Sequence, residues 1–195
     1  MGKIFCLMGK SSSGKDTIFK EIKDDRDLNL KPIISYTTRP KRVNETDGVE
    51  YFFISIDELK EYEKQNKVIE QRIYHTVDGD WYYCTINDNQ IDLDKNNYLL
   101  ITTLESYKSL RDYFGADKVY PLYVNVEDGV RLERALNREK SQSNPNYDEL
   151  CRRFLADNKD FSQENLNNLN IDKSYINENL KECINNIKED ILSLI

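Results

Sequence analysis

The chain has 195 residues and a formal net charge of −7, and 32% of its residues are charged. That length suits one compact domain whose central sheet is covered by helices on both faces. The charge disfavours extended contact with a nucleic-acid backbone, and no apolar run approaches the roughly 18 residues that a membrane span needs, so we expect neither nucleic acid nor membrane as a partner.

The first expected element is a strand over residues 3–8, KIFCLM, a short apolar run that ends at Gly9. A helical pattern follows over residues 15–25, so the chain begins as strand, glycine-bounded loop and helix. The apolar run is too short for the apolar region of a signal peptide, and the four cysteines lack metal-ligand spacing. We therefore expect a cytoplasmic protein with reduced thiols.

Residues 9–17, GKSSSGKDT, contain the spacing G-x-x-x-x-G-K between this strand and helix. Glycines at both ends let backbone N–H groups turn inward around a phosphate, and Lys15 can reach the outer phosphates of a nucleoside triphosphate. Asp16 replaces the hydroxyl residue that usually follows the lysine and could hold a metal-bound water, so Thr17 is the better phosphate contact. The predicted triphosphate-binding residues of this loop are Gly9, Ser11, Ser12, Ser13, Gly14, Lys15, Asp16 and Thr17.

A second anion site is expected in residues 35–51, SYTTRPKRVNETDGVEY, which overlap a strand candidate over residues 32–36. Arg39 and Arg42 can each bind phosphate oxygens in a bidentate fashion, and Tyr51 adds a phenol hydroxyl. The sequence therefore predicts that this segment binds one dianionic phosphate.

The rest of the chain predicts an α/β fold with a smaller insert. Strands alternate with helices, which implies a parallel five-stranded sheet covered on both faces. Between residues 37 and 86 the segments VEYFFIS, KVIEQRIY and DWYYCTI alternate in polarity, which predicts a partly antiparallel insert. The polar stretch 139–147 suits a mobile flap. The expected core strands are residues 3–8, 32–36, 97–103, 119–126 and 174–176, and the expected helices are residues 15–25, 57–65, 105–114, 127–139, 147–161 and 177–194.

Together these motifs resemble the guanylate kinase family of P-loop nucleoside monophosphate kinases. Residues 35–51 fit the family's pattern S-x-x-T-R-x-x-R-x-x-E-x-x-G-x-x-Y, and softer similarity continues through KVIEQRIYHTVDGDWYYCT, LNREKSQSNPNYDELCRRF and SYINENL. The resemblance implies the three-layer P-loop fold and one domain over residues 1–195. Its expected parts are a core of residues 1–36, 87–138 and 155–195, a monophosphate-binding insert of residues 37–86, and a helical lid of residues 139–154.

The resemblance also implies the reaction and its residues. ATP would phosphorylate GMP, and dGMP as well, with Mg²⁺ bridging the outer phosphates mostly through water and Asp16 near it. Glu70 would accept hydrogen bonds from guanine N1–H and the exocyclic amine. The implied GMP-binding residues are Ser35, Arg39, Arg42, Tyr51, Glu70, Tyr82, Cys84 and Thr103, the catalytic residues are Lys15, Arg39, Arg138 and Arg153, and Asn177 would lie near the adenine of ATP.

Several assignments stay open in the sequence. Arg134 and Arg152 lie close enough to Arg138 and Arg153 to exchange roles with them. The family's D-x-D-x-Q-G-like run is absent, and NYLLITTLES offers Thr102, Thr103 and Glu105 instead. The alternatives are therefore a kinase of another nucleoside monophosphate or a non-catalytic peptide-binding module of the same fold. We expect a monomer or weak homodimer, and no catalytic role for His75.

Overall fold

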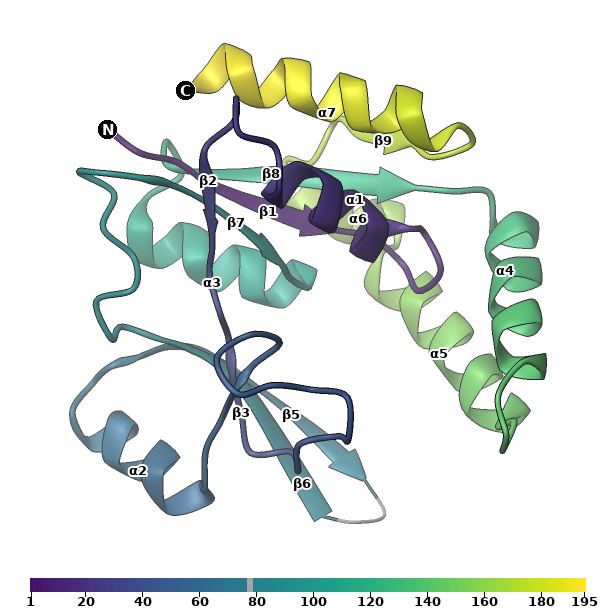
Figure 1. Ribbon diagram of the computed structural model, residues 1–195, viewed down its shortest axis with the longest axis horizontal. Coiled ribbons are helices and arrows are strands. Elements are labelled where there is room, and N and C mark those ends of the chain that lie inside the picture. Colours follow the sequence, from purple (N-terminus) through teal and green to yellow (C-terminus); the bar gives the residue numbers. More distant parts are fainter. Residues whose placement is uncertain (77–78) are drawn as a thin grey trace.

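The computed structural model describes residues 1–76 and 79–195, and its core is a five-stranded parallel sheet (Figure 1). The strand order is β2-β7-β1-β8-β9, and every neighbouring pair is parallel. This arrangement confirms the predicted α/β fold class. The core strands are β1 (Ile4–Met8), β2 (Leu30–Pro32), β7 (Asn97–Ile101), β8 (Val119–Asn125) and β9 (Ser174–Ile176).

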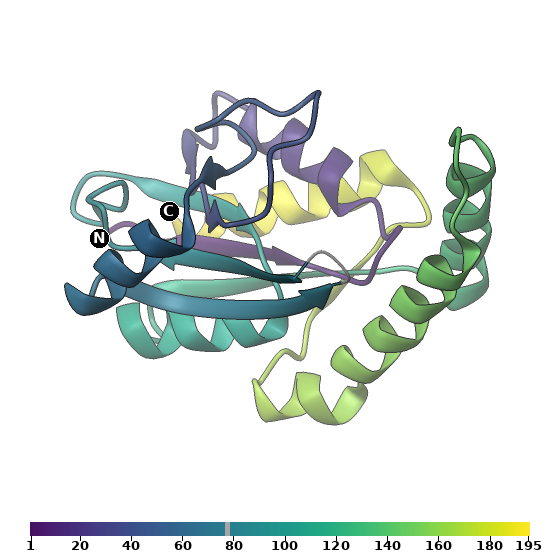
Figure 2. The same cartoon turned by 90° about the horizontal axis from the view of Figure 1, so that it is seen from below.

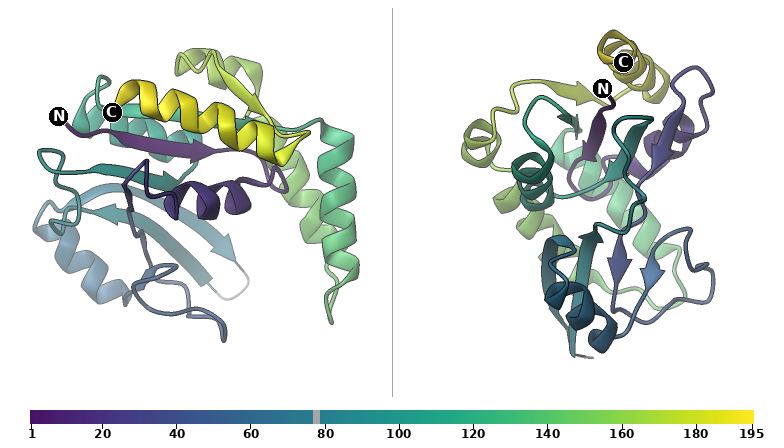
Figure 3. Two further views of the ribbon diagram at one scale, coloured as in Figure 1. Left: turned by 45° about the horizontal axis from the view of Figure 1, so that its top comes forward. Right: turned by 90° about the vertical axis from the view of Figure 1, so that its left-hand side faces the viewer.

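Helices cover both faces of the core sheet because successive side chains of a strand point to opposite faces. Along β1, Ile4, Cys6 and Met8 pack in one buried cluster with α3 (Leu104–Phe114). Phe5 and Leu7 pack in another with α1 (Lys15–Lys23) and α7 (Leu180–Leu194), which lie over the same face (Figure 3). Each fully buried large apolar side chain contributes about 1.5–3 kcal/mol, so this strand is a main source of stability.

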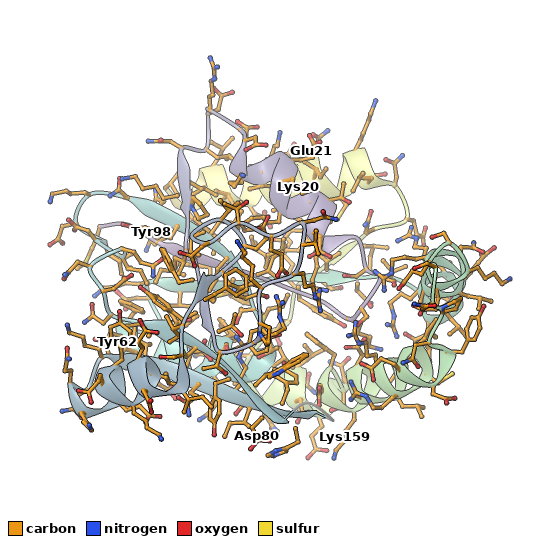
Figure 4. All side chains as sticks on the ribbon, turned by 60° about the horizontal axis from the view of Figure 1, so that its bottom comes forward. Lys20, Glu21, Tyr62, Asp80, Tyr98 and Lys159 are labelled. Atoms are coloured by element: carbon orange, nitrogen blue, oxygen red, sulfur yellow. The ribbon has the colours of Figure 1, made fainter. Side chains whose placement is uncertain are left out.

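The insert forms a second sheet of four strands in the order β4-β3-β6-β5. Two of its pairs are antiparallel and the β3–β4 pair is parallel, which agrees with the partly antiparallel arrangement expected. Helix α2 (Ile56–Lys64) covers one face, and in Figure 4 Tyr62 marks this helix while Asp80 marks the outer end of the β5–β6 hairpin. Its strands are β3 (Tyr36–Thr37), β4 (Phe52–Phe53), β5 (Val68–Thr76) and β6 (Gly79–Ile86).

Two long helices, α4 (Asp128–Lys140) and α5 (Tyr147–Asp160), form a hairpin that projects from the core (Figure 2). A polar loop of residues 141–146 joins them at the predicted flap, and α6 (Gln163–Asn168) follows α5. Asn146 starts α5 by accepting a hydrogen bond from the Glu149 N–H. The polar loop therefore ends in a helix cap, which fixes the start of the returning helix.

Four details differ from the sequence-based expectation. Residues 32–36 do not form one strand, because β2 ends at Pro32 and Tyr36 pairs with the insert instead. The helix expected at residues 57–65 packs on the insert rather than crossing over the core sheet. Helix α7 begins at Leu180, since Asn179 caps it, and α6 was not expected. Val77 and Asp78 of the expected insert lie outside the described residues.

Two negative expectations can be compared with the described part of the chain. None of its helices combines the length and the apolar character needed to cross a membrane. All four cysteines are free thiols, and only Cys151 is exposed.

Candidate active site

The phosphate loop lies between β1 and α1, and its backbone requires glycine. Gly14 precedes the helix with φ of 85°, and Ser12 also has a positive φ of 62°. A Cβ atom on Gly14 would lie 2.4 Å from Nδ2 of Asn177. That Nδ2 donates a 2.8 Å hydrogen bond to the Ser13 carbonyl. The Asn177 side chain therefore supports the loop, and its expected place beside the adenine of ATP stays a prediction.

Several polar groups of this loop lack protein partners. Among the described residues, the buried hydroxyls of Ser12 and Ser13 have no hydrogen-bond partner. Lys15 forms no ion pair within the same ranges. Buried polar groups are normally satisfied, and unpaired donors at a helix N-terminus favour a bound phosphate. The loop is thus suited to hold an anion where the sequence predicted one.

The start of the loop is anchored to the helical hairpin by a buried charge network. Arg131 on α4 is 1% exposed and donates to the Ser11 carbonyl at 3.0 Å and to Asp128 at 2.8 Å. Asp157 on α5 accepts the Ser11 N–H at 2.7 Å. Lys10 reaches Asp128 and Asn158 from the loop itself. The Ser11 N–H, expected to face phosphate, is therefore used for this attachment.

A cavity of about 500 Å³ is lined mainly by α4, α5 and the loop that joins them, and Ser11 of the phosphate loop also contributes to its lining. Arg42 of the insert, Arg138 of α4 and Arg153 of α5 all contribute to its lining. Arg153 donates to Glu149 at 2.7 Å, whereas Arg42 and Arg138 have no side-chain partner among the described residues. Hydrogen bonds from Arg152 and Arg153 lower the pKa of Glu149 to about 2. Three guanidinium groups from three elements thus meet around one space.

The structure separates these arginines from their neighbours in sequence. Arg134 does not line the cavity and donates to the Asn177 carbonyl at 3.3 Å. Arg152 also lies outside the lining and pairs with Glu149. Arg138 and Arg153 are therefore the two that face the cavity, in line with the sequence-based choice.

Arg39 is placed differently from the open phosphate clamp that was expected. Its side chain is buried and pairs with both carboxylate oxygens of Glu45 at 2.8 and 2.9 Å. The remaining bonds go to the Tyr83 hydroxyl and the Pro40 carbonyl. These bonds use four of the five N–H donors of a guanidinium, and the bonds from Arg39 lower the pKa of Glu45 to about 2. Arg39 therefore stiffens the loop, while the exposed Arg42 stays open to a ligand.

The site-facing side of β6 carries Tyr83 and Thr85, which corrects the placement of Tyr82 and Cys84. Tyr82 packs against the apolar cluster beneath α2, and Cys84 is fully buried within it. Tyr83 instead bonds Arg39 and packs edge-on against Tyr51, with ring centroids 5.5 Å apart. Because strand side chains alternate, one step along the strand exchanges the two faces. The alternation of side chains along DWYYCTI could have predicted that Tyr83 and Thr85 share one face and that Tyr82 and Cys84 share the other.

Glu70 lies where the insert meets the core, and it is almost fully buried. Its carboxylate accepts hydrogen bonds from Thr85 on β6 at 2.8 Å and from Ser106 on α3 at 2.6 Å. A third bond comes from Arg72 at 3.2 Å. Sequence reasoning predicted Glu70 but missed all three donors. Thr85 and Ser106 come close to it only through the packing of β5 against β6 and α3, whereas the position of Arg72, two residues along the same strand, follows from strand alternation.

The other predicted residues have mainly structural contacts. Thr103 is half-buried and caps α3 by accepting the Ser106 N–H. The Ser35 carbonyl accepts the Phe52 N–H and so holds β4 in the insert. His75 pairs with Asp80 at an exposed position, and its lack of a catalytic role stays a prediction.

The residues at the phosphate loop fit a loosely held divalent cation. Asp16 is exposed in the first turn of α1, and the described residues contain no group of three acidic, histidine or cysteine side chains able to cage a metal. Mg²⁺ usually binds through one or two carboxylates together with substrate phosphates and water. A lone carboxylate beside a phosphate loop suits that mode.

Comparisons with known proteins agree with this geometry. A sequence model of the guanylate kinase family matches residues 1–191. A curated guanylate kinase of Porphyromonas gingivalis is 25% identical over 197 residues, covering 100% of this chain and 99% of that protein. One of Mycoplasma mobile is 28% identical over 193 residues, covering 97% of this chain and 94% of that protein.

The fold also has a solved counterpart. The crystal structure of guanylate kinase from Anaplasma phagocytophilum matches with a TM-score of 0.66 at 17% identity, covering 98% of this chain and 85% of that one. Since the family model spans nearly the whole sequence, the chain belongs to the guanylate kinase family.

Proposed function

We propose that this protein is an enzyme that transfers the γ-phosphoryl group of ATP to GMP, and to dGMP, giving the nucleoside diphosphate. The observation that carries the proposal is the cavity in which Arg42, Arg138 and Arg153 meet beside the phosphate loop. Phosphoryl transfer needs donor and acceptor held in line and the charge of the transferring oxygens neutralised. Three guanidinium groups next to a phosphate-binding loop supply that neutralisation.

The two nucleotides are assigned to the two sides of this cavity. The loop from Gly9 to Thr17 holds the triphosphate of ATP, with Lys15 following the outer phosphate. Arg42, Tyr51 and Tyr83 hold the phosphate of GMP. Asp16 would help to hold Mg²⁺, which would supply further charge neutralisation there.

No general base is needed for this reaction. The GMP phosphate is already ionised near neutral pH and can attack directly. His75, with its side chain 81% exposed and paired with Asp80, has no part in the chemistry. Arg138 and Arg153 stabilise the transferring group, and Arg39 acts indirectly by holding the loop that carries Arg42.

Base recognition centres on Glu70 at the inner end of the insert. Its carboxylate accepts the two adjacent donors of guanine, N1–H and the exocyclic amine. Thr85 contacts Glu70 directly, so we assign it, rather than Cys84, to the base-binding side of the sheet.

Domain motion follows from the layout of the charges. We propose that residues 37–86 and the lid of residues 139–154 close on a core formed by residues 1–36, 87–138 and 155–195. Without nucleotides the facing arginines repel one another, so the open form dominates. Binding both substrates closes the lid and excludes water, which limits ATP hydrolysis. We assign the enzyme to the cytoplasm, as a monomer or weak homodimer.

A coupled assay with ATP against GMP, dGMP, AMP, UMP and CMP tests the function. We expect turnover of GMP and dGMP far above the others. Faster turnover of AMP or UMP would support a kinase of another monophosphate, which Thr102 and Thr103, directly after β7, make the second candidate. Absence of any turnover would point to a peptide-binding module.

A further inference from the structure

Arg72 is a charged residue beside Glu70 to which none of the motifs assigns a role. It lies on β5 two residues after Glu70, and it pairs across the sheet with Tyr83. Residues two apart on a strand share a face, as do direct cross-strand partners. Arg72 therefore lies on the face that carries Glu70 and Tyr83, between the base-reading carboxylate and the phosphate-binding tyrosines.

The side chain of Arg72 is only partly used by the protein. Its Nε donates to Glu70 Oε2 at 3.2 Å, and the side chain is 13% exposed against 2% for Glu70. Within residues 1–76 and 79–195, its two Nη groups have no hydrogen-bond partner. Burial raises the pKa of the Tyr51 phenol, and the charge of Arg72 opposes that rise, which is consistent with a guanidinium nearby. Up to four N–H donors are thus available to a ligand.

The hydrogen bonds of Glu70 show which contact a base can replace. An ionised carboxylate has about four acceptor positions, and Thr85, Ser106 and Arg72 already fill three. A guanine edge brings two more donors, so one protein donor must move. The Thr85 and Ser106 bonds are shorter and come from buried hydroxyls. The longer bond from the more exposed Arg72 is therefore the one to adjust.

Once it adjusts, Arg72 is next to the part of guanine that Glu70 cannot read. The edge of guanine presents O6, N1–H and the exocyclic amine in that order, an acceptor followed by two donors. Glu70 has only acceptors for the two donors, whereas Arg72 has only donors, and arginine side chains commonly donate to guanine O6 in nucleic-acid recognition. Adenine has an amine donor where guanine has O6, and an unprotonated acceptor at N1. The amine would face the donors of Arg72, and N1 would face the acceptors of Glu70.

We propose that Arg72 is a specificity-determining residue that donates a hydrogen bond to guanine O6 while Glu70 binds N1–H and the amine. This inference rests on the proposed phosphorylation of GMP and extends it by naming the group that recognises O6. In the free protein, Arg72 takes the place of the base by donating to Glu70 Oε2, in addition to the Thr85 and Ser106 hydroxyls. When guanine binds, its donors replace the donor of Arg72, so the Glu70 carboxylate keeps its hydrogen bonds.

The test compares GMP with 6-thio-GMP, in which a weakly accepting sulfur replaces O6 and the other edge groups remain. We expect the wild-type protein to prefer GMP, and Arg72→Ala to lower kcat/KM for GMP by roughly 10- to 150-fold, as for one hydrogen bond to a charged group. The loss should fall mainly on KM. For 6-thio-GMP the change in kcat/KM should be small. In Arg72→Ala the ratio of kcat/KM for GMP to kcat/KM for 6-thio-GMP should therefore approach one. Arg26→Ala, at an exposed position outside the site, is the matched control.

Equal losses for the two nucleotides would overturn the proposal, because a structural or phosphate-binding role lowers both together. If Arg72→Ala does not fold, the ratio of kcat/KM for GMP to that for 6-thio-GMP is measured with Arg72→Lys instead. Its single ammonium cannot bridge Glu70 and O6 with a planar fork, so a reduced preference is expected and an undiminished one contradicts the geometry. If wild-type protein fails to phosphorylate GMP, the proposed function itself is refuted. If it does so with a preference that Arg72→Ala leaves unchanged, only this inference is refuted.

Discussion

Arg131→Ala should destabilise the protein because it removes the cation that joins the phosphate loop to both hairpin helices. Removing one partner of a buried ion pair costs about 3–5 kcal/mol. Here Asp128 is 45% exposed and Asp157 is 19% exposed, so water compensates part of the loss. We therefore expect the free energy of unfolding to fall by about 3 kcal/mol, at the lower end of that range. At about 2–4 °C per kcal/mol for a domain of this size, Tm should fall by about 6–12 °C.

Urea denaturation followed by circular dichroism measures this change, with Arg26→Ala as the control. Steady-state kinetics should show a larger rise in the KM for ATP than in that for GMP, because Arg131 holds the Ser11 carbonyl and forms no hydrogen bond or ion pair with the described residues of the insert. A loss of less than about 1 kcal/mol, typical of an exposed pair, together with an unchanged KM for ATP, would refute the view that this network positions the loop.

Three further predictions concern the site. Arg153→Ala should lower kcat far more than it raises either KM, and equal effects on kcat and KM in steady-state kinetics would contradict its role in the transition state. The lowered pKa of Glu45, about 2 against 4.5 for the free group, means that its ion pair with Arg39 stabilises the fold fully above pH 4.5 and is lost as the pH falls toward 2. Glu45→Gln should flatten that part of the pH dependence of the unfolding free energy, and an unaltered profile would show that the pair does not contribute. Gly14→Ala should raise the KM for ATP by roughly tenfold or more, because a left-handed backbone costs about 1–2 kcal/mol outside glycine and the new methyl would meet Asn177; an unchanged KM would contradict the argument.

The elements with local signals were predictable from the sequence. The strand from Ile4, the phosphate loop and the helix from Lys15 follow from an apolar run, two glycines and a 3.6-residue period. Glu70 was found through a resemblance over a longer segment. The parallel direction of the core strands also follows from the alternation of strands and helices.

The errors come from information that is not local. Whether Tyr82 or Tyr83 faces the site depends on the register of β6, and β5 has an irregularity between Val68 and Glu70 that shifts its pairing. Asp157 lies 146 residues from Ser11, whose N–H it accepts. No spacing rule connects residues so far apart, so this attachment could only be found in the folded structure.

The contact between Ser106 and Glu70 joins the insert to the core at one end of the insert's strands, and this position gives the insert a fulcrum. Tyr83 lies two residues along β6 from Thr85, about 7 Å farther out at the usual rise of a strand. Any rotation about the Glu70 end would therefore carry Tyr83 through a longer arc than the Glu70 carboxylate. If the insert closes as proposed, the base would be bound near the pivot before the outer end of the insert had completed its longer movement.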